Sequence, residues 1–127
     1  MRLLKAVYGL CNAPHEWYQT VKKDIIKTGF TAIMMEPCIW TLWDQDEIVA
    51  ICFIHVDDMV IGYRIDNNMA LRKLSDVKNL YKWGSWEETA FDQCGSELVQ
   101  LQDGTILQSL ERAARKIMPI PLDARGR

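Results

Sequence analysis

A nearly continuous run of apolar residues, residues 48–54, leads almost directly into two adjacent aspartates, Asp57 and Asp58. A second apolar stretch, residues 59–62, follows at once. The first run has the length of a strand and falls far short of the ~18 apolar residues that a membrane-spanning helix needs. The pattern predicts a tight β-hairpin with both carboxylates at its turn, and the apolar character of residues 47–56 predicts a strand covered on both faces.

Residues 13–28 are predicted to form an amphipathic helix. Its apolar stripe repeats at four-residue spacing and consists of Trp17, Val21 and Ile25. Asn12 is a suitable N-cap, Pro14 falls in the first turn, where a missing N–H costs nothing, and Gly29 follows as the stop. The position of Trp17 on the stripe predicts that its ring packs in the core.

The rest of the chain reads as further short strands and helices. The predicted elements are a strand at residues 39–43 with a turn at 44–46, a helix from Asn67 or Asn68 to about residue 81, a hairpin of residues 97–101 and 105–107 around Asp103 and Gly104, and a short helix at residues 110–117. The inner side of the second helix is predicted to carry Leu71, Leu74, Val77 and Leu80. This order favours an α+β fold in which an antiparallel β-hairpin sheet packs on helices.

The composition is that of one globular domain, with 127 residues, 49% of them hydrophobic and 25% charged. A net charge of −2 excludes a strongly cationic module that binds nucleic acid by bulk electrostatics. The four cysteines are Cys11, Cys38, Cys52 and Cys94. They are far apart in apolar or aromatic surroundings, which predicts reduced core cysteines of an intracellular protein. The sequence indicates neither a signal peptide nor a membrane contact.

The two adjacent aspartates have a chemical and a structural interpretation. Two like charges this close raise each other's pKa unless a cation neutralises them. Mg²⁺ prefers oxygen ligands, usually one or two carboxylates together with substrate phosphates, and a pair of such ions catalyses phosphoryl displacement. The alternative is a solvated Asp-Asp turn between two strands, because aspartate favours turns.

Several blocks of the sequence, in order, resemble the palm region of copia-type LTR retrotransposon reverse transcriptases. The blocks are residues 4–10 (LKAVYGL) with Ala13, Pro14, Trp17 and Tyr18; Gly29 and Phe30 followed by residues 36–40 (EPCIW); residues 53–62 (FIHVDDMVIG); and, weakly, residues 84–107. The resemblance covers about residues 3–108, and residues 109–127 match loosely. It implies that residues 1–127 form a single partial reverse-transcriptase domain, a partial polymerase palm.

The resemblance also implies a site and a reaction. Asp57 and Asp58 would be the paired catalytic aspartates and the ligands of two Mg²⁺ ions. The segment beneath the incoming nucleotide and template would include Gly9, Leu10, Asn12, Ala13 and Pro14. The implied reaction is RNA-directed DNA synthesis from deoxynucleoside triphosphates on a primer–template, with inline attack of the primer 3′-hydroxyl on the α-phosphate and loss of pyrophosphate.

The chain departs from the family pattern at three places. The palm mechanism needs a third carboxylate from an upstream strand, and the seven residues before Tyr8 include no acidic residue. Cys11 and Asn12 replace the usual Lys-Gln, and His55 replaces a tyrosine. We therefore expect this chain to be inactive as a polymerase on its own. The alternatives are a non-catalytic remnant that binds nucleic acid or protein and a non-functional translated fragment of an element.

Overall fold

The structure is a computed structural model that describes residues 11–118. Its contacts divide the chain into two compact units, Met1–Trp83 and Gly84–Arg127. The described elements of the first unit are α1 (Ala13–Thr28), β1 (Thr31–Ile33), β2 (Glu36–Asp44), β3 (Glu47–His55), β4 (Asp58–Tyr63) and α2 (Asn68–Lys78). The second unit contains β5 (Ala90–Gln93), β6 (Ser96–Gln100), β7 (Ile106–Ser109) and α3 (Glu111–Ala114). Helices and antiparallel sheets together confirm the α+β class.

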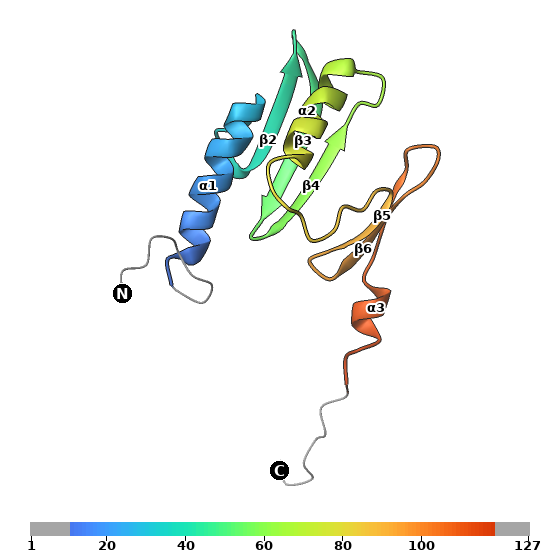
Figure 1. Ribbon diagram of the computed structural model, residues 1–127. Helices are drawn as coiled ribbons and strands as arrows, with labels where there is room; N and C mark the ends of the chain where they lie inside the picture. Colours follow the sequence, from blue (N-terminus) through green and yellow to red (C-terminus); the bar gives the residue numbers. More distant parts are fainter. Residues whose placement is uncertain (1–10, 119–127) are drawn as a thin grey trace, which may run out of the picture. The chain divides into compact units, whose positions relative to one another are not determined.

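The first unit is built on a four-stranded antiparallel sheet in the order β1-β2-β3-β4, so every strand pairs with its neighbour in sequence (Figure 1). Short turns suffice for such pairings, because antiparallel strands can be joined by two-residue hairpins. Residues Gln45 and Asp46 connect β2 to β3, and Val56 and Asp57 connect β3 to β4. The longest strand pair, β2 with β3, forms the centre of the sheet.

A single hydrophobic cluster joins α1 and α2 to the sheet. Its buried members are Val21, Ile25, Phe30, Trp40, Leu42, Val49, Ala50, Cys52, Ile54, Ala70 and Val77. Cys52 and Ile54 are two apart on β3 and both are buried, and Trp40 of β2 pairs directly with Cys52, so all three lie on the sheet face that the helices cover. Burial of these apolar side chains supplies most of the driving force for folding this unit.

Among residues 11–83, no helix covers the opposite face of the sheet. Ile48 and Ile51 of β3 are 41% and 47% exposed, so the expectation that this strand is covered on both faces is wrong. The apolar run has another cause. The register shifts so that Leu42 pairs with Ala50 and the next residue with Ile48. The β-bulge leaves Val49 as an extra residue that is buried beside Ala50, which breaks the alternation.

Both predicted helices of the first unit are present. The α1 bounds are as expected, with proline in its first turn and Gly29 in the left-handed conformation at φ 105°, donating its N–H to the Ile26 carbonyl. Asn12 occupies the N-cap, but its side chain makes no capping bond. In α2 the Asn67 side chain accepts a hydrogen bond from the Ala70 N–H at 2.8 Å.

The second helix differs from its prediction in two respects. It ends at Lys78, three residues early, where the Trp83 indole N–H donates to the Lys78 carbonyl at 3.1 Å. Leu71, which was predicted to face inward, is exposed, and Ala70 is buried in its place. The buried stripe is therefore Ala70, Leu74 and Val77. Residues 70, 74 and 77 are at positions i, i+4 and i+7 and share one face of the helix, which turns Leu71 toward solvent.

The second unit consists of a three-stranded antiparallel sheet in the order β5-β6-β7, followed by α3. The predicted hairpin about Asp103 and Gly104 is confirmed as β6 and β7. Gly104 adopts φ 86° and the Asp103 carboxylate accepts from the Thr105 N–H at 2.9 Å, which fixes the turn. No sequence pattern predicted β5. The last helix, α3, has four residues, and none of them is buried.

The cysteines also depart from their expectation. All four are free, but only Cys52 is buried, while Cys38 is half-buried and Cys11 and Cys94 are exposed. The interpretation as core cysteines therefore holds for Cys52 alone. Burial raises the pKa of the Cys52 thiol to about 12.

No helix within residues 11–118 is long and apolar enough to cross a membrane.

Candidate functional site

The β3–β4 hairpin carries the two aspartates, but its turn lies one residue earlier than predicted. Val56 and Asp57 form the two-residue turn, and Asp58 is the first residue of β4, where it pairs with His55 across the ladder. The sequence could not fix this detail, because the apolar run gives no local signal for the last paired residue. Both aspartates are exposed.

The register places Asp58 on the sheet face that α1 and α2 leave uncovered. Directly paired residues point to the same face, and residues two apart on one strand share a face. Asp58 therefore shares its face with His55 and with the Phe53–Val60 pair, whereas Ile54 and its partner point into the core. The imidazole of His55 stacks on the Phe53 ring, with centroids 6.3 Å apart and planes 10° from parallel.

The turn holds a strained residue. Val56 has φ 55°, a conformation that β-branched residues rarely adopt and that costs about 1–3 kcal/mol. Gln45, the first residue of the two-residue turn at the other end of β3, has the same φ, and it too is followed by an aspartate, Asp46. The two ends of β3 therefore share one backbone pattern, and they differ in the side chains around them.

The carbonyl of Val56 accepts a hydrogen bond from Nε1 of Trp17 at 2.7 Å. The Trp17 ring packs against the edge of the hydrophobic cluster, as predicted, but it is only partly buried and its N–H reaches the hairpin turn. This contact joins α1 to the loop that carries Asp57. No sequence pattern predicts this contact, because it depends on how the helix lies against the sheet.

Three aromatic rings, those of Trp17, Tyr81 and Trp83, pack in series next to this contact. Tyr81 packs against Trp17 with ring centroids 5.5 Å apart and against Trp83 at 5.3 Å in an edge-to-face arrangement. The Tyr81 hydroxyl donates to Asp24 of α1 at 2.7 Å. Hydrogen bonds from Lys27 and Tyr81 lower the pKa of the Asp24 carboxyl, whereas burial, followed by the bond to Asp24, raises the pKa of Tyr81.

The predicted nucleotide and template residues are only partly described. Gly9 and Leu10 lie outside the described residues. Asn12 precedes α1, and Ala13 and Pro14 begin it. Because Trp17, one turn further along, contacts the hairpin turn, the first turns of α1 lie beside the segment that carries the aspartates. None of these three residues makes a described side-chain bond to Asp57 or Asp58.

The two carboxylates are of the kind that Mg²⁺ prefers. Within residues 11–118, however, no group of three or more His, Cys, Asp or Glu side chains is placed to hold a metal ion. The donor set therefore fits a divalent cation that takes its other ligands from elsewhere, such as substrate phosphates or another protein segment.

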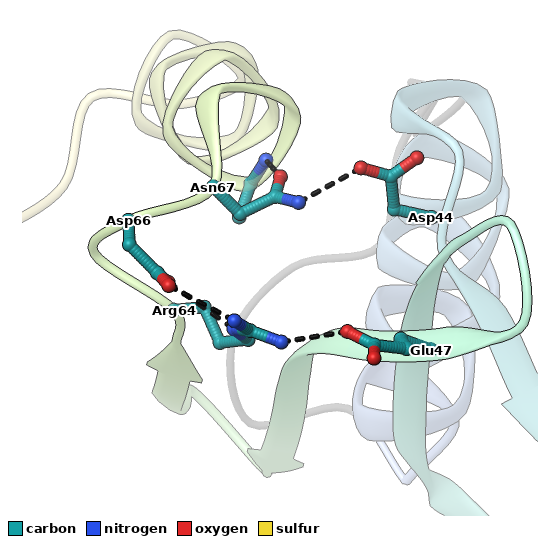
Figure 2. Close-up of polar contacts among 6 residues, drawn as sticks. Asp44, Glu47, Arg64, Asp66 and Asn67 are labelled. Atoms are coloured by element: carbon teal, nitrogen blue, oxygen red, sulfur yellow. Dashed lines mark hydrogen bonds and ion pairs between the residues drawn. The ribbon is translucent and has the colours of Figure 1, made fainter.

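A second polar cluster, which no sequence pattern predicted, occupies the opposite end of β3. Figure 2 shows Arg64 between Glu47 and Asp66. The Arg64 guanidinium donates to Glu47 at 2.7 Å and makes two hydrogen bonds to Asp66, at 3.1 and 2.9 Å. Asn67 donates to Asp44 at 2.8 Å, so the residue that caps α2 also contacts the end of β2. The cluster borders an open cleft of about 440 Å³. The Asn67–Asp44 bond joins the start of α2 to the sheet at the end far from Asp57.

Comparisons with known proteins find relatives among transposon polyproteins. The transposon Ty1-MR1 Gag-Pol polyprotein of Saccharomyces cerevisiae is 30% identical over 136 residues, a match that covers 100% of this chain and 8% of the polyprotein. The truncated transposon Ty1-A Gag-Pol polyprotein of the same yeast is 28% identical over 137 residues, covering 100% of this chain and 11% of the relative. No protein-family model matches the sequence, and no solved structure matches it.

The chain spans 8% and 11% of the length of these two curated relatives. The matches run along the whole chain, so they include both compact units. The relatives are copia-type polyproteins. Along its whole length the chain is therefore similar to part of copia-type Gag-Pol polyproteins, which supports a retrotransposon origin.

Proposed function

We propose that this chain is part of a retrotransposon reverse transcriptase, the palm segment in which Asp57 and Asp58 bind the divalent cations of nucleotidyl transfer. The observation that carries the proposal is the β3–β4 hairpin. It brings two adjacent carboxylates to the tip of a four-stranded sheet backed by helices, and it directs Asp58 to the uncovered face. The homology to Gag-Pol polyproteins supports the same origin.

In this proposal the protein contributes two negatively charged carboxylates at the β3–β4 turn. Asp57 lies in the turn and Asp58 in the first pair of β4, so these two neighbouring residues would hold the cation. Bound Mg²⁺ would activate the attacking primer hydroxyl and stabilise the leaving oxygen of the displaced pyrophosphate. The start of α1, with Asn12, Ala13 and Pro14, would contribute surface for the nucleotide and template.

Two carboxylates do not complete such a site. The described residues contain no third ligand near them, and no acidic residue of the chain precedes Glu16. The missing ligand would have to come from another segment of a longer polyprotein. We therefore expect residues 1–127 alone to bind Mg²⁺ weakly and to extend no primer.

The ion-binding part of the proposal is tested on the whole chain by NMR. Millimolar Mg²⁺ should shift the amide and carboxyl signals of Asp57 and Asp58, and Asp57→Asn should abolish the shifts. Asp46→Asn is the matched control, because Asp46 occupies the equivalent position in the turn at the other end of β3. Absence of a Mg²⁺ response at the tip, or an equal response at Asp46, would contradict the proposal.

A second measurement separates the catalytic segment from a binding remnant, the alternative that the lack of a third ligand favours. Gel shifts with a primer–template are compared for the unmodified chain and Asp57→Asn, with and without Mg²⁺. Binding that depends on Mg²⁺ and on Asp57 supports the reverse-transcriptase assignment. Binding that is unchanged by both supports a remnant that contacts nucleic acid without the site. Primer extension by the chain alone would overturn the expected inactivity.

A further inference from the structure

The turn that carries Asp57 is bonded to a side chain from a distant part of the sequence. Nε1 of Trp17 donates to the Val56 carbonyl at 2.7 Å, across 39 positions of the chain. The peptide group whose oxygen accepts this bond links Val56 to Asp57. The bond therefore restrains the backbone directly before Asp57 and two residues before Asp58, the first paired residue of β4.

Within residues 11–118, the His55–Asp58 pair closes this turn, but the side chain of Val56 adds little to hold its backbone angle. Val56 is 61% exposed, so its side chain has little packing to select a backbone angle. Its φ of 55° lies in a region that valine avoids, whereas glycine or asparagine would adopt it readily. A two-residue turn with an unfavourable residue would relax in isolation, and an external hydrogen bond opposes that relaxation.

Trp17 is itself fixed in direction. Its ring packs on Tyr81, and the Tyr81 hydroxyl is bonded to Asp24, seven positions after Trp17 on α1. Residues seven apart on a helix lie on one face. Tyr81 therefore contacts the same face of α1 twice, through the ring of Trp17 and through the carboxylate of Asp24. Trp83 also packs against Tyr81, in an edge-to-face arrangement. The indole N–H is thus presented by a rigid support rather than by a freely rotating side chain.

We propose that Trp17 is a positioning residue: it holds the strained Val56–Asp57 turn so that Asp57 and Asp58 are presented in one arrangement at the tip of the hairpin. The effect on cation binding rests on the proposed function, but the restraint on the turn does not. Trp17 acts through the backbone of the turn and touches no reacting group.

The experiment compares Trp17→Phe with Tyr18→Phe in the whole chain. Trp17→Phe keeps an aromatic ring and removes the indole N–H. Tyr18→Phe is the matched control, because the Tyr18 hydroxyl also joins α1 to a strand carbonyl, that of Pro37, at 2.8 Å. The readout is the NMR order parameter of the backbone amides of residues 56–58. We expect values near 0.85 to fall below about 0.6 in Trp17→Phe and to stay unchanged in Tyr18→Phe.

A rescue variant separates positioning from general packing. Val56→Asn introduces a residue that tolerates positive φ, so Trp17→Phe should loosen the turn much less in a Val56→Asn background than in the unmodified chain. Amides of β2 and β3 report whether the fold persists. Order parameters at residues 56–58 that stay unchanged in Trp17→Phe, or a loosening that spreads equally through β2 and β3, would overturn the inference.

The Mg²⁺ titration distinguishes this inference from the function on which it draws. With both correct, Trp17→Phe raises the half-saturating Mg²⁺ concentration several-fold and Tyr18→Phe leaves it unchanged. A turn that loosens in Trp17→Phe of a chain that never responds to Mg²⁺ supports the restraint and contradicts the proposed function. An ordered turn with an unchanged Mg²⁺ response in Trp17→Phe overturns the inference and leaves the proposed function standing.

Discussion

At the scale of single residues, the chain places similar side chains in very different environments. Cys52 is buried at the centre of the sheet, where its thiol has no access to water, whereas Cys11 and Cys94 are exposed. Asp24 is held by two hydrogen bonds, whereas Asp57 and Asp58 are open to solvent. Environment, rather than residue type, therefore decides which groups react and which stabilise the fold.

Cys52 should resist thiol reagents in the folded chain. With a pKa of about 12, it carries almost no thiolate at pH 8, and the thiolate is the nucleophile. Cys11 and Cys94 should react with a disulfide reagent under native conditions, and Cys52 should react after addition of denaturant. Peptide mapping of the labelled protein gives the answer. Labelling of Cys52 in folded protein as fast as Cys94 would contradict its placement in the core.

Asp24→Asn should lower stability in a pH-dependent manner. The bonds from Lys27 and Tyr81 hold the folded pKa of Asp24 below its usual value, so the carboxylate stabilises the fold above the pKa of the unfolded chain. This contribution is lost as pH falls through the folded pKa. The Tm difference between the unmodified chain and Asp24→Asn should thus be larger at pH 6 than at pH 3. A difference that stays constant would show that the charge of Asp24 contributes nothing.

At the scale of elements, the sequence predicts what depends on near neighbours in the chain. The bounds of α1 follow from its four-residue spacing, its proline and Gly29, and all these signals are local. The burial of Val49 does not follow, because a bulge requires knowledge of the partner strand. The bond from Trp17 to Val56 is equally hidden, since it depends on how a helix lies against a turn 39 residues away.

Two neighbouring isoleucines of α1 test how this helix packs. Ile25 is fully buried in the hydrophobic cluster, whereas Ile26 is 51% exposed. Ile25→Ala should lower the free energy of unfolding by about 2–5 kcal/mol through lost burial and the cavity left behind. Ile26→Ala should change it by about 0.5 kcal/mol or less. Urea denaturation measures both values, and equal costs would mean that α1 presents a different face to the sheet.

At the scale of the molecule, the two compact units differ in how much core they possess. All the buried apolar residues within residues 11–118 belong to the first unit, and the buried residue of the second is Ser96. A three-stranded sheet without a hydrophobic interior has little to oppose the entropy of unfolding. Local stability should therefore fall sharply after Trp83.

Hydrogen exchange followed by mass spectrometry should resolve this difference. Peptides from β2 and β3 should exchange slowly, because their amides open only with the core, and peptides from β5, β6 and β7 should exchange at least tenfold faster. The measurement uses the whole chain at neutral pH. Equal protection in the two sheets would contradict this prediction, because the second sheet would then be more stable than its own few buried residues explain.

The matching backbone of the turns at the two ends of β3 gives the molecule an internal standard. Both begin with a residue at φ 55° and continue with an aspartate, yet only the second has a further aspartate at the next position and a bond from Trp17. A property that depends only on the backbone conformation of the turn should occur at both ends of β3. A property confined to the Asp57 end must arise from side chains, so exchanging the two dipeptides would separate the contribution of shape from that of surroundings.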